Sequence, residues 1–377
     1  MEKTAPSLTS ALQTHIQQLI QSSGGWIGFD HFMALALYQP GLGYYANDRQ
    51  KFGTMPQDGQ GGQSDQAADG SDFVTAPEIS PLFGQTLAVQ VAQALDTTQT
   101  CEVWEFGAGS GALAEQLLQT LGDKVQRYRI VDLSGSLRVR QQQRLQPFAH
   151  KVEWVAELPD SLQAVVVGNE VLDAMPVQLL VRKGGQWFER GVVWADGAFA
   201  WDDRPTALHP PAEIDGPHDY LTEIHPQGEA FIRTLADRLT QGAAFFLDYG
   251  FPEAEYYHAQ RSTGTVMCHY AHRADPDPLG LVGLKDITAH VNFTGIALAG
   301  QDAEPSLHVL GYTSQARFLM NCGLLSKMER ATHAERANAL KLISEHEMGE
   351  LFKVIAFGVG EAWEPLGFAQ GDRSHTL

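Results

Sequence analysis

The stretch EFGAGSG, residues 105–111, decides the fold. It begins at the end of an apolar segment, residues 102–106, and is followed by the helix-forming sequence ALAEQLLQTL at residues 112–121. Glycine tolerates positive φ and lets a ligand approach the backbone without meeting a side chain. The helix that begins after the glycines offers unpaired N–H groups. This order of strand, glycine-rich turn and helix is typical of a nucleotide-binding α/β fold.

The rest of the chain supports an α/β fold. Helices are expected at residues 112–121 and 137–145, between the earlier strands. Such alternation indicates a parallel, doubly wound, Rossmann-like sheet. A C-terminal strand is expected at or near the sheet edge. The full set of expected strands is 102–106, 128–133, 152–155, 164–168, 243–247 and 351–359.

A helical N-terminal region is expected upstream of this sheet, at residues 1–98. Apolar residues recur at i, i+4 spacing between residues 79 and 95, which predicts an amphipathic helix. Residues 57–70, QDGQGGQSDQAADG, contain no aromatic residue and no aliphatic residue larger than alanine. Such a segment cannot bury enough surface to offset its ordering entropy. We therefore expect a flexible insertion there, with an inert loop favoured over an active-site lid.

The Rossmann-like domain is expected to occupy residues 99–377. One segment interrupts its alternation of strands and helices: residues 177–201 read as two or three short strands joined at Gly184-Gly185 and Asp196-Gly197. Such pairs are typical of tight hairpin turns. We therefore expect a β-hairpin or meander inserted after the fourth strand.

The glycines alone do not identify the cofactor, because Gly107, Gly109 and Ala112 also satisfy the dinucleotide pattern. Glu105 favours S-adenosylmethionine (SAM): a carboxylate there would repel the pyrophosphate of NAD but attract the ammonium and sulfonium groups of SAM. The alternative is that Glu105 is only a solvated strand end. Asp132, at the end of the second strand, could accept the ribose hydroxyls of either cofactor or could cap a helix.

Two carboxylates follow the fourth strand. Asn169 and Glu170 come directly after it, and Asp173 is three residues further on. Ligands of open α/β sheets bind at the carboxyl ends of the strands. Glu170 and Asp173 could share one face of a helical turn and hold a guanidinium group in a fork. A capping arrangement around the turn to Pro176 is the alternative, but unpaired buried charges are costly, which favours a functional role.

Two other acidic segments leave their roles open. Asp248-Tyr249-Gly250 ends the fifth strand, where Asp248 could orient a substrate or Gly250 could simply make the turn. Asp286 and His290 are spaced by one helical turn, so we expect a local hydrogen-bonded pair rather than metal ligands.

The cysteines indicate neither a metal site nor a disulfide framework. Cys268, His269 and His272 lack a second cluster of ligands, so no metal is expected. The chain contains three cysteines, of which Cys101 and Cys322 lie far from these residues. With neither a secretory signal nor a transit peptide visible, we expect a cytoplasmic protein.

The net charge of −19 excludes some partners and favours others. An acidic surface repels phosphate backbones, so nucleic acid is not an expected substrate. A basic protein segment would be attracted, although the charge also serves solubility alone. No apolar run is long enough to predict a membrane span, and the oligomeric state is not predicted.

At these residues the sequence resembles the MidA-like SAM-dependent methyltransferases, a class I, Rossmann-like family. Its mitochondrial members methylate an arginine on a respiratory complex I subunit. Ser110 stands where those members have a bulky basic residue, and Asp132 keeps an acid. The matching segments, in order along nearly the whole chain, are FMALALYQPGLGYYA (32–46), DFVTAPEISPLFGQ (72–85), EFGAGSGALA (105–114), NEVLDAMPV (169–177), FFLDYG (245–250), DITAHVNF (286–293) and MGELFKVIAFG (348–358).

The resemblance implies a site in two parts. Residues 75–78, TAPE, would lie near SAM, and the reacting end would carry Asn169, Glu170 and Asp173. The expected cofactor-binding residues are Thr75, Pro77, Glu78, Glu105, Phe106, Gly107, Gly109, Gly111, Asp132 and Leu133.

The expected function is therefore SAM-dependent methyl transfer to an arginine of a protein. A small-molecule methyltransferase is the nearest alternative, although the N-terminal, hairpin and C-terminal additions suit a larger substrate. A non-catalytic SAM-binding assembly factor would not need both the glycines and Glu170. An NAD-dependent oxidoreductase is disfavoured by Glu105.

Overall fold

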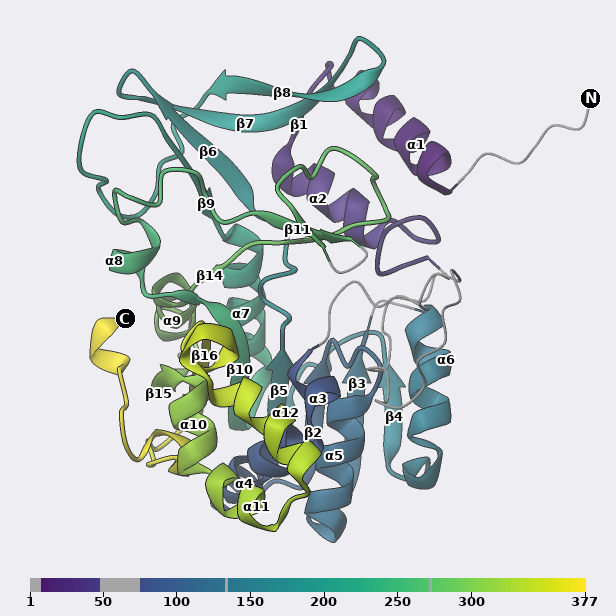
Figure 1. The fold of residues 1–377 in the computed structure, drawn as a ribbon, viewed down its shortest axis with the longest axis vertical. Helices are drawn as coiled ribbons and strands as arrows, with labels where there is room; N and C mark the ends of the chain where they lie inside the picture. Colours follow the sequence, from purple (N-terminus) through teal and green to yellow (C-terminus); the bar gives the residue numbers. More distant parts are fainter. Residues whose placement is uncertain (1–7, 48–74, 133–134, 271–272) are drawn as a thin grey trace, which may run out of the picture.

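A computed structural model describes residues 8–47, 75–132, 135–270 and 273–377. Figure 1 shows two lobes, an α/β lobe below and a lobe above that carries a second sheet with α1 and α2. The insertion expected at residues 57–70 lies outside the described residues, as does Leu133. None of the described helices is long and apolar enough to cross a membrane.

The lower lobe is built on a sheet that contains all the expected strands. The strand predicted at 351–359 lies next to the edge, as expected. From one edge to the other the order is β15 (His308–Ser314), β16 (Phe352–Gly358), β10 (Leu239–Phe251), β5 (Leu162–Asn169), β2 (Glu102–Phe106), β3 (Arg127–Val131) and β4 (Val152–Val155), and β14 (Val291–Asn292) pairs with the end of β10.

The strands that alternate with helices are parallel, as expected, but the sheet as a whole is mixed. The strands from β10 to β4 are parallel, but β16 is antiparallel to both β10 and β15. An apolar run identifies a buried strand without giving its direction, which depends on the connection. Here the chain leaves β15 through α10 (Gln315–Asn321), α11 (Leu324–Arg330) and α12 (His333–Ile343) before it returns as β16.

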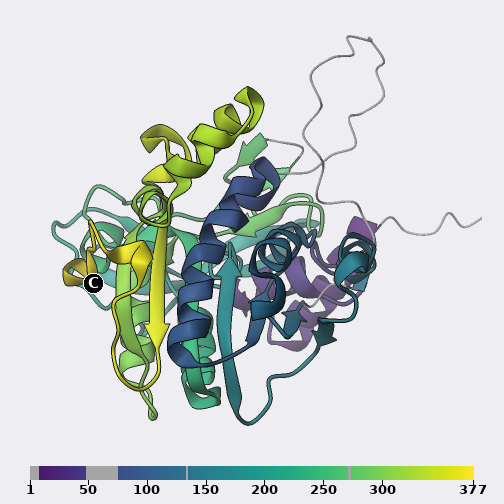
Figure 2. The same cartoon turned by 90° about the horizontal axis from the view of Figure 1, so that it is seen from below.

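Helices cover both faces of this sheet (Figure 2). Along β5, Val165 and Val167 pack in the cluster that contains α4 and α5, whereas Val166 packs in the cluster that contains α7 and α9. This alternation is the side-chain period of a strand buried on both faces. The first cluster contains residues of α4 (Pro81–Thr98), α5 (Ala112–Leu121), α10, α11 and α12, and the second contains residues of α7 (Pro226–Arg238) and α9 (Phe293–Gln301). Along the chain, α6 (Gly135–Arg144) follows β3 and α8 (Glu253–Tyr256) follows β10.

The helix expected at residues 79–95 begins later than predicted, because the chain breaks at Ser80. A short helix, α3 (Ala76–Ile79), precedes the break, and α4 begins at Pro81. Ser80 is extended, with φ −152° and ψ 130°, and its hydroxyl accepts a hydrogen bond from the Leu82 N–H at 3.3 Å. The residue before a proline is disfavoured in a helix, so Ser80 becomes the N-cap of α4.

The meander expected at residues 177–201 forms strands β6 and β7 and the start of β8 in the sheet of the upper lobe. Its turns lie at the predicted glycines, with φ 54° and 80° at Gly184 and Gly185. The strands of this sheet are β1 (Ile27–Gly28), β6 (Gln178–Lys183), β7 (Gln186–Ala195), β8 (Ala198–Pro205) and β9 (Tyr220–Ile224), and the helices packed on it are α1 (Leu8–Ser22) and α2 (Phe29–Tyr38). Helix α4, which lies within the predicted N-terminal region, packs on the central sheet. The domain boundary expected at residues 98/99 stays a prediction.

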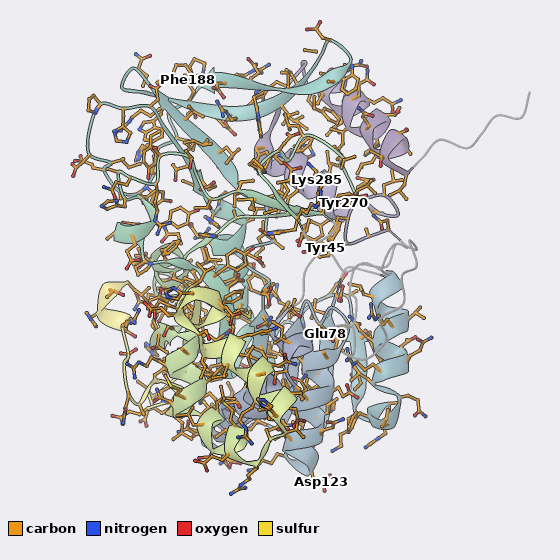
Figure 3. The ribbon with its side chains drawn as sticks, viewed as in Figure 1. Tyr45, Glu78, Asp123, Phe188, Tyr270 and Lys285 are labelled. Carbon is orange, nitrogen blue, oxygen red and sulfur yellow. The ribbon has the colours of Figure 1, made fainter. Side chains whose placement is uncertain are left out.

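A third sheet is formed by β11 (Met267–Tyr270), β12 (Arg273–Asp275) and β13 (Asp286–Thr288). Asp286 therefore begins a strand and is not one helical turn from His290. Its Oδ1 instead accepts a hydrogen bond from the Tyr45 hydroxyl at 2.8 Å. In Figure 3 Tyr45 lies at the lower side of the upper lobe, facing the lobe that carries Glu78.

Candidate active site

The turn that follows β5 is held by one carboxylate. Asp248, on the neighbouring strand β10, is 1% exposed. Its Oδ2 accepts hydrogen bonds from the N–H groups of Val171, Leu172 and Asp173 at 3.0, 2.8 and 3.3 Å. Glu170 enters this turn with φ 54°, a conformation that few residues other than glycine adopt. The role of Asp248 was not among the alternatives expected from the sequence: its carboxylate fixes the turn that carries Glu170.

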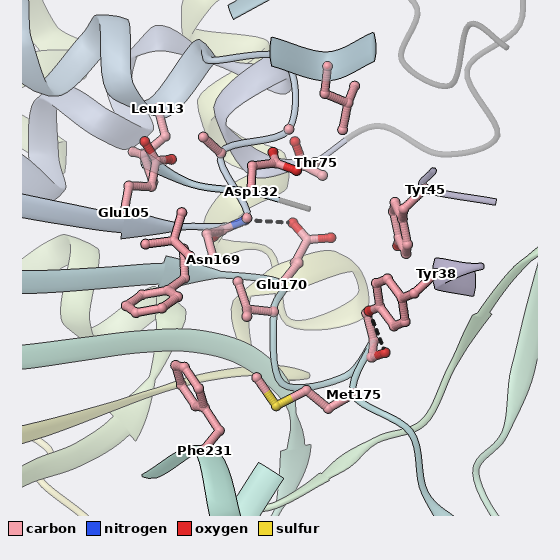
Figure 4. A pocket seen from close by; sticks show the side chains of 18 of the residues that line it. Tyr38, Tyr45, Thr75, Glu105, Leu113, Asp132, Asn169, Glu170, Met175 and Phe231 are labelled. Atoms are coloured by element: carbon pink, nitrogen blue, oxygen red, sulfur yellow. Dashed lines mark hydrogen bonds between the residues drawn. The ribbon is translucent and has the colours of Figure 1, made fainter. Parts of the chain in front are cut away.

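A pocket of about 600 Å³ lies at the carboxyl ends of β2, β3 and β5, and residues of the upper lobe complete its wall (Figure 4). This is the position at which open α/β sheets bind ligands. The predicted site residues that line it are Thr75, Pro77, Glu105, Phe106, Gly107, Gly109, Asp132, Asn169 and Glu170.

The glycine-rich turn has the conformation that its sequence predicts. Gly107, Gly109 and Gly111 have φ values of 65°, 53° and 82°. A Cβ atom on Gly107 would come within 3.0 Å of the Val171 side chain, so this position has little room for a side chain. Gly111 does not line the pocket and is instead the N-cap of α5. The turn thus leaves backbone at the pocket wall, which suits close approach of a ligand.

Asp132 is held in place by a residue that the sequence did not reveal. The amide nitrogen of buried Gln141 donates to Asp132 Oδ2 at 2.8 Å and to the carbonyl oxygen of Gly109 at 2.9 Å. Its amide oxygen accepts a hydrogen bond from the Trp154 indole at 2.8 Å. Gln141 lies in the polar sequence LRVRQQQR, which reads as a solvent-exposed helix face. It connects the acid after β3 with the glycine-rich turn after β2.

Glu105 is buried rather than a solvated strand end. It is 2% exposed, and its Oε2 accepts a hydrogen bond from the Tyr128 hydroxyl at 2.7 Å. Burial raises its pKa to about 8, although the Tyr128 hydrogen bond opposes this shift. A neutral carboxyl group is therefore favoured at neutral pH, and a cationic ligand in the pocket would stabilise the ionised form.

Glu78 lies beside the pocket wall and not on it. Its carboxylate accepts a hydrogen bond from the Ser110 hydroxyl and pairs with Arg144 at 2.8 Å. Arg144 also donates to the Ser110 hydroxyl at 2.7 Å and to Glu115 at 3.0 Å. This network joins α3 to the glycine-rich turn and to α6, so Glu78 contributes to the shape of the pocket without lining it.

Glu170 is the carboxylate of the predicted acidic pair that faces the pocket. Its Oε1 accepts a hydrogen bond from the Asn169 amide at 2.9 Å, and the backbone N–H of Ala76 also donates to its carboxylate. Loss of hydration, followed by the nearby charge of Asp173, raises the pKa of Glu170 to about 8. Its carboxyl group is therefore held beside Ala76 of α3, and a cation in the pocket would favour its ionised form.

Asp173 does not form an open fork with Glu170. Its side chain is 4% exposed, lies behind the pocket wall and hydrogen-bonds to the Tyr249 hydroxyl. Burial raises the pKa of Asp173 to about 6, against the effect of that hydrogen bond. The two carboxylates interact through charge, but only Glu170 can touch a ligand in the pocket.

Two other groups of lining residues were not predicted. Tyr38 and Tyr45 come from α2 and the segment after it, which the family resemblance covered without assigning them a role. Gln227, Ala230, Phe231 and Thr234 lie on one face of α7 and form another part of the wall. Helical spacing could have identified that face, but not what it covers. No metal-binding group of three or more His, Cys, Asp or Glu side chains occurs within the described ranges.

The buried Glu105 should make stability fall as pH rises. Its carboxyl ionises in the unfolded chain near its ordinary pKa of 4.5, but near 8 in the folded protein. The resulting cost is absent below pH 4.5, grows as pH rises and is complete above 8. Glu105→Gln stays neutral and keeps an acceptor for Tyr128, so its stability relative to the wild type should increase from pH 5 to pH 8. Urea unfolding at each pH measures this difference, and a difference that stays constant would contradict the burial argument.

Two solved structures share this architecture over the whole chain. A protein from Burkholderia thailandensis, solved with S-adenosylhomocysteine bound, is 48% identical with a TM-score of 0.91, and both chains are covered completely. A native structure from the same organism is 46% identical with a TM-score of 0.87, again over both whole chains.

Curated relatives are more distant. The mitochondrial protein arginine methyltransferase NDUFAF7 homologue of Caenorhabditis elegans is 26% identical, over 91% of this chain and 84% of its own length. The NDUFAF7 protein of Danio rerio is 24% identical, over 94% and 88% respectively. The family model of S-adenosyl-L-methionine-dependent methyltransferases matches residues 86–313. The MidA-like resemblance is thus confirmed, and the chain belongs to this family of SAM-dependent methyltransferases.

Proposed function

We propose that this enzyme transfers a methyl group from SAM to a guanidinium nitrogen of an arginine in a basic protein segment. The observation that carries the proposal is the Glu170 carboxylate at the pocket wall, held by Asn169 and Ala76. A guanidinium group is permanently charged and offers N–H donors in a plane, which suits paired recognition by a carboxylate. Glu170 would thus bind the substrate and set the plane of the group to be methylated.

The pocket fits the cofactor in size and chemistry. Its volume of about 600 Å³ is within the usual range for small-molecule sites. Asp132 would accept the ribose hydroxyls, and Gly107 and Gly109 would let the cofactor lie against the backbone. Glu105 would ionise to balance the cationic part of the cofactor. Thr75, Pro77 and Phe106 complete this half of the wall, and Glu78 and Gly111 would support it from behind.

Bound SAM supplies an activated methyl group, so the protein's main task is alignment. Glu170 would hold the guanidinium edge through charge-assisted hydrogen bonds, with Asn169 fixing the carboxylate. The nearby charge of Asp173 raises the proton affinity of Glu170. The ionised Glu170 carboxylate, which lines the pocket, would therefore take the proton that the substrate nitrogen loses.

The choice of a protein arginine is supported by the curated relatives, which are named protein arginine methyltransferases. The net charge of −19 would favour a basic segment, in line with electrostatic complementarity at interfaces. A subunit of respiratory complex I is the candidate partner suggested by the family resemblance. We propose a cytoplasmic location, since all three cysteines are unpaired thiols. A small-molecule substrate is the alternative that product analysis would reveal.

Gly109→Val should abolish SAM binding, because a branched side chain would occupy the pocket wall where the cofactor lies. Gly184→Val is a matched control. Gly184 has φ 54°, against 53° at Gly109, but lies in the hairpin turn of the upper lobe with open space around it. Both variants place valine at nearly the same positive φ, so calorimetric titration with SAM separates the effect of positive φ from that of a blocked site. Normal SAM affinity in a folded Gly109→Val protein would show that the cofactor site is elsewhere.

Glu170→Gln should retain SAM affinity and lose most methyl transfer, because a neutral amide cannot balance the guanidinium charge. Asp173→Asn should lose less, since Asp173 does not line the pocket. Glu170 becomes charged as pH rises through about 8, so wild-type kcat/KM should increase from pH 6 through pH 8 and level off only well above pH 8. This rise should be missing in Glu170→Gln. Wild-type turnover of an arginine substrate by Glu170→Gln, or a small metabolite as the labelled product in cell extract, would refute the proposal.

A further inference from the structure

Two tyrosines form an aromatic surface in the pocket, beyond the residues assigned above. Tyr38, at the end of α2, and Tyr45, after it, both line the pocket. Their ring centroids are 5.6 Å apart and their planes differ by 20°, so the rings are stacked. Tyr44 meets Tyr45 edge-on from the core side, with centroids 5.0 Å apart, and is itself 2% exposed. The pair is therefore supported from behind and presents ring surface to the pocket.

Both hydroxyl groups are engaged in hydrogen bonds. Tyr38 donates to the carbonyl oxygen of Ala174 at 2.7 Å, and Tyr45 donates to Asp286 Oδ1 at 2.8 Å. One bond ties Tyr38 to the segment that follows β5, and the other ties Tyr45 to β13. Burial, with the charge of Asp286 as the next cause, raises the pKa of both tyrosines, so they stay neutral phenols. With the hydroxyls occupied, what remains for a ligand is the ring surface.

The pair lines the same pocket as the proposed substrate carboxylate. In the view of Figure 4, Glu170 lies between Asn169 on one side and Tyr38 and Tyr45 on the other, with Glu105 and Asp132 further along the pocket. The upper lobe therefore supplies aromatic rings to the pocket into which the lower lobe places Glu170. A planar cation could meet Glu170 with its edge and a tyrosine ring with its face.

We propose that Tyr38 and Tyr45 select the planar guanidinium of arginine over the ammonium of lysine, an inference that rests on the proposed function. Glu170 alone attracts either cation. A guanidinium is weakly hydrated on its faces and stacks on aromatic rings, whereas an ammonium is a compact, strongly hydrated charge. The carboxylate would supply affinity for positive charge, and the tyrosine pair would supply the preference for a planar group.

The test uses the full-length protein and two probes, acetyl-Gly-Gly-Arg-Gly-Gly-amide and its lysine counterpart. Calorimetry on the protein saturated with S-adenosylhomocysteine gives the Kd of each peptide. A separate labelled-SAM assay, without added S-adenosylhomocysteine, gives kcat and KM. The variants are Tyr38→Leu and Tyr45→Leu, which remove a ring, and Tyr38→Phe and Tyr45→Phe, which keep it without the hydroxyl. Their affinity for S-adenosylhomocysteine and their thermal stability monitor folding.

Each leucine variant should weaken arginine-peptide binding about three- to thirtyfold, the range expected for a cation–π contact. The effect should be in KM more than in kcat, and lysine-peptide binding should change less than twofold. The phenylalanine variants should stay within about threefold of the wild type for both peptides, because the ring is kept.

Four outcomes would overturn the inference, three of them without touching the proposed function. Unchanged arginine-peptide affinity in the leucine variants, with wild-type methylation of arginine intact, would reject the tyrosine role alone. Equal weakening of both peptides would show that the rings act only as an apolar wall. A wild-type enzyme that methylates the lysine peptide as well as the arginine peptide would show that no selection occurs. Methyl transfer to neither peptide by the wild type would instead reject the proposed function itself, and this inference with it.

Discussion

The backbone hydrogen bonds to Asp248 are the interaction on which the site depends. A single carboxylate oxygen accepts three successive N–H groups after β5, which fixes the direction of a turn that begins at positive φ. Burial, followed by the charges of Asp173 and Glu170, raises the pKa of Asp248, whereas the N–H groups oppose that shift. Three acids thus share one buried region, and only Glu170 reaches the pocket. A cation in the pocket would stabilise the ionised form of Glu170 against the charge of these neighbouring acids.

The two lobes contribute different chemistry to one pocket. The central sheet supplies the glycine-rich turn, Asp132 and Glu170, all at the carboxyl ends of strands. The upper lobe supplies Tyr38 and Tyr45, and the Tyr38 hydroxyl is bonded to the Ala174 carbonyl just after the acidic turn. The lobes are therefore joined at the reacting end itself, where a small shift of α2 would alter the surface that faces Glu170.

Much of the fold could be predicted because local sequence determines it. The strand, turn and helix around residues 105–111, and the hairpin turns at Gly184 and Asp196, follow from glycine conformation and apolar period. Strand direction at β16 could not be predicted, since it depends on a connection through three helices. In the site, spacing placed Glu170 and Asp173 together but could not tell which one faces the pocket. Gln141 resembled a surface residue because its partners lie outside its own helix, Asp132 just after β3 and Trp154 in β4.

The central claim is that a cationic substrate group meets a carboxyl that is largely protonated beforehand. Proton counting tests this directly: arginine-pentapeptide binding to the enzyme saturated with S-adenosylhomocysteine is measured by calorimetry at pH 7 in buffers of different ionisation enthalpy. Because the pKa of Glu170 is about 8, the account predicts release of about one proton on binding, as the carboxyl ionises to meet the guanidinium. Glu170→Gln should release none. Binding without proton release by the wild type, or equal release by Glu170→Gln, would contradict the account.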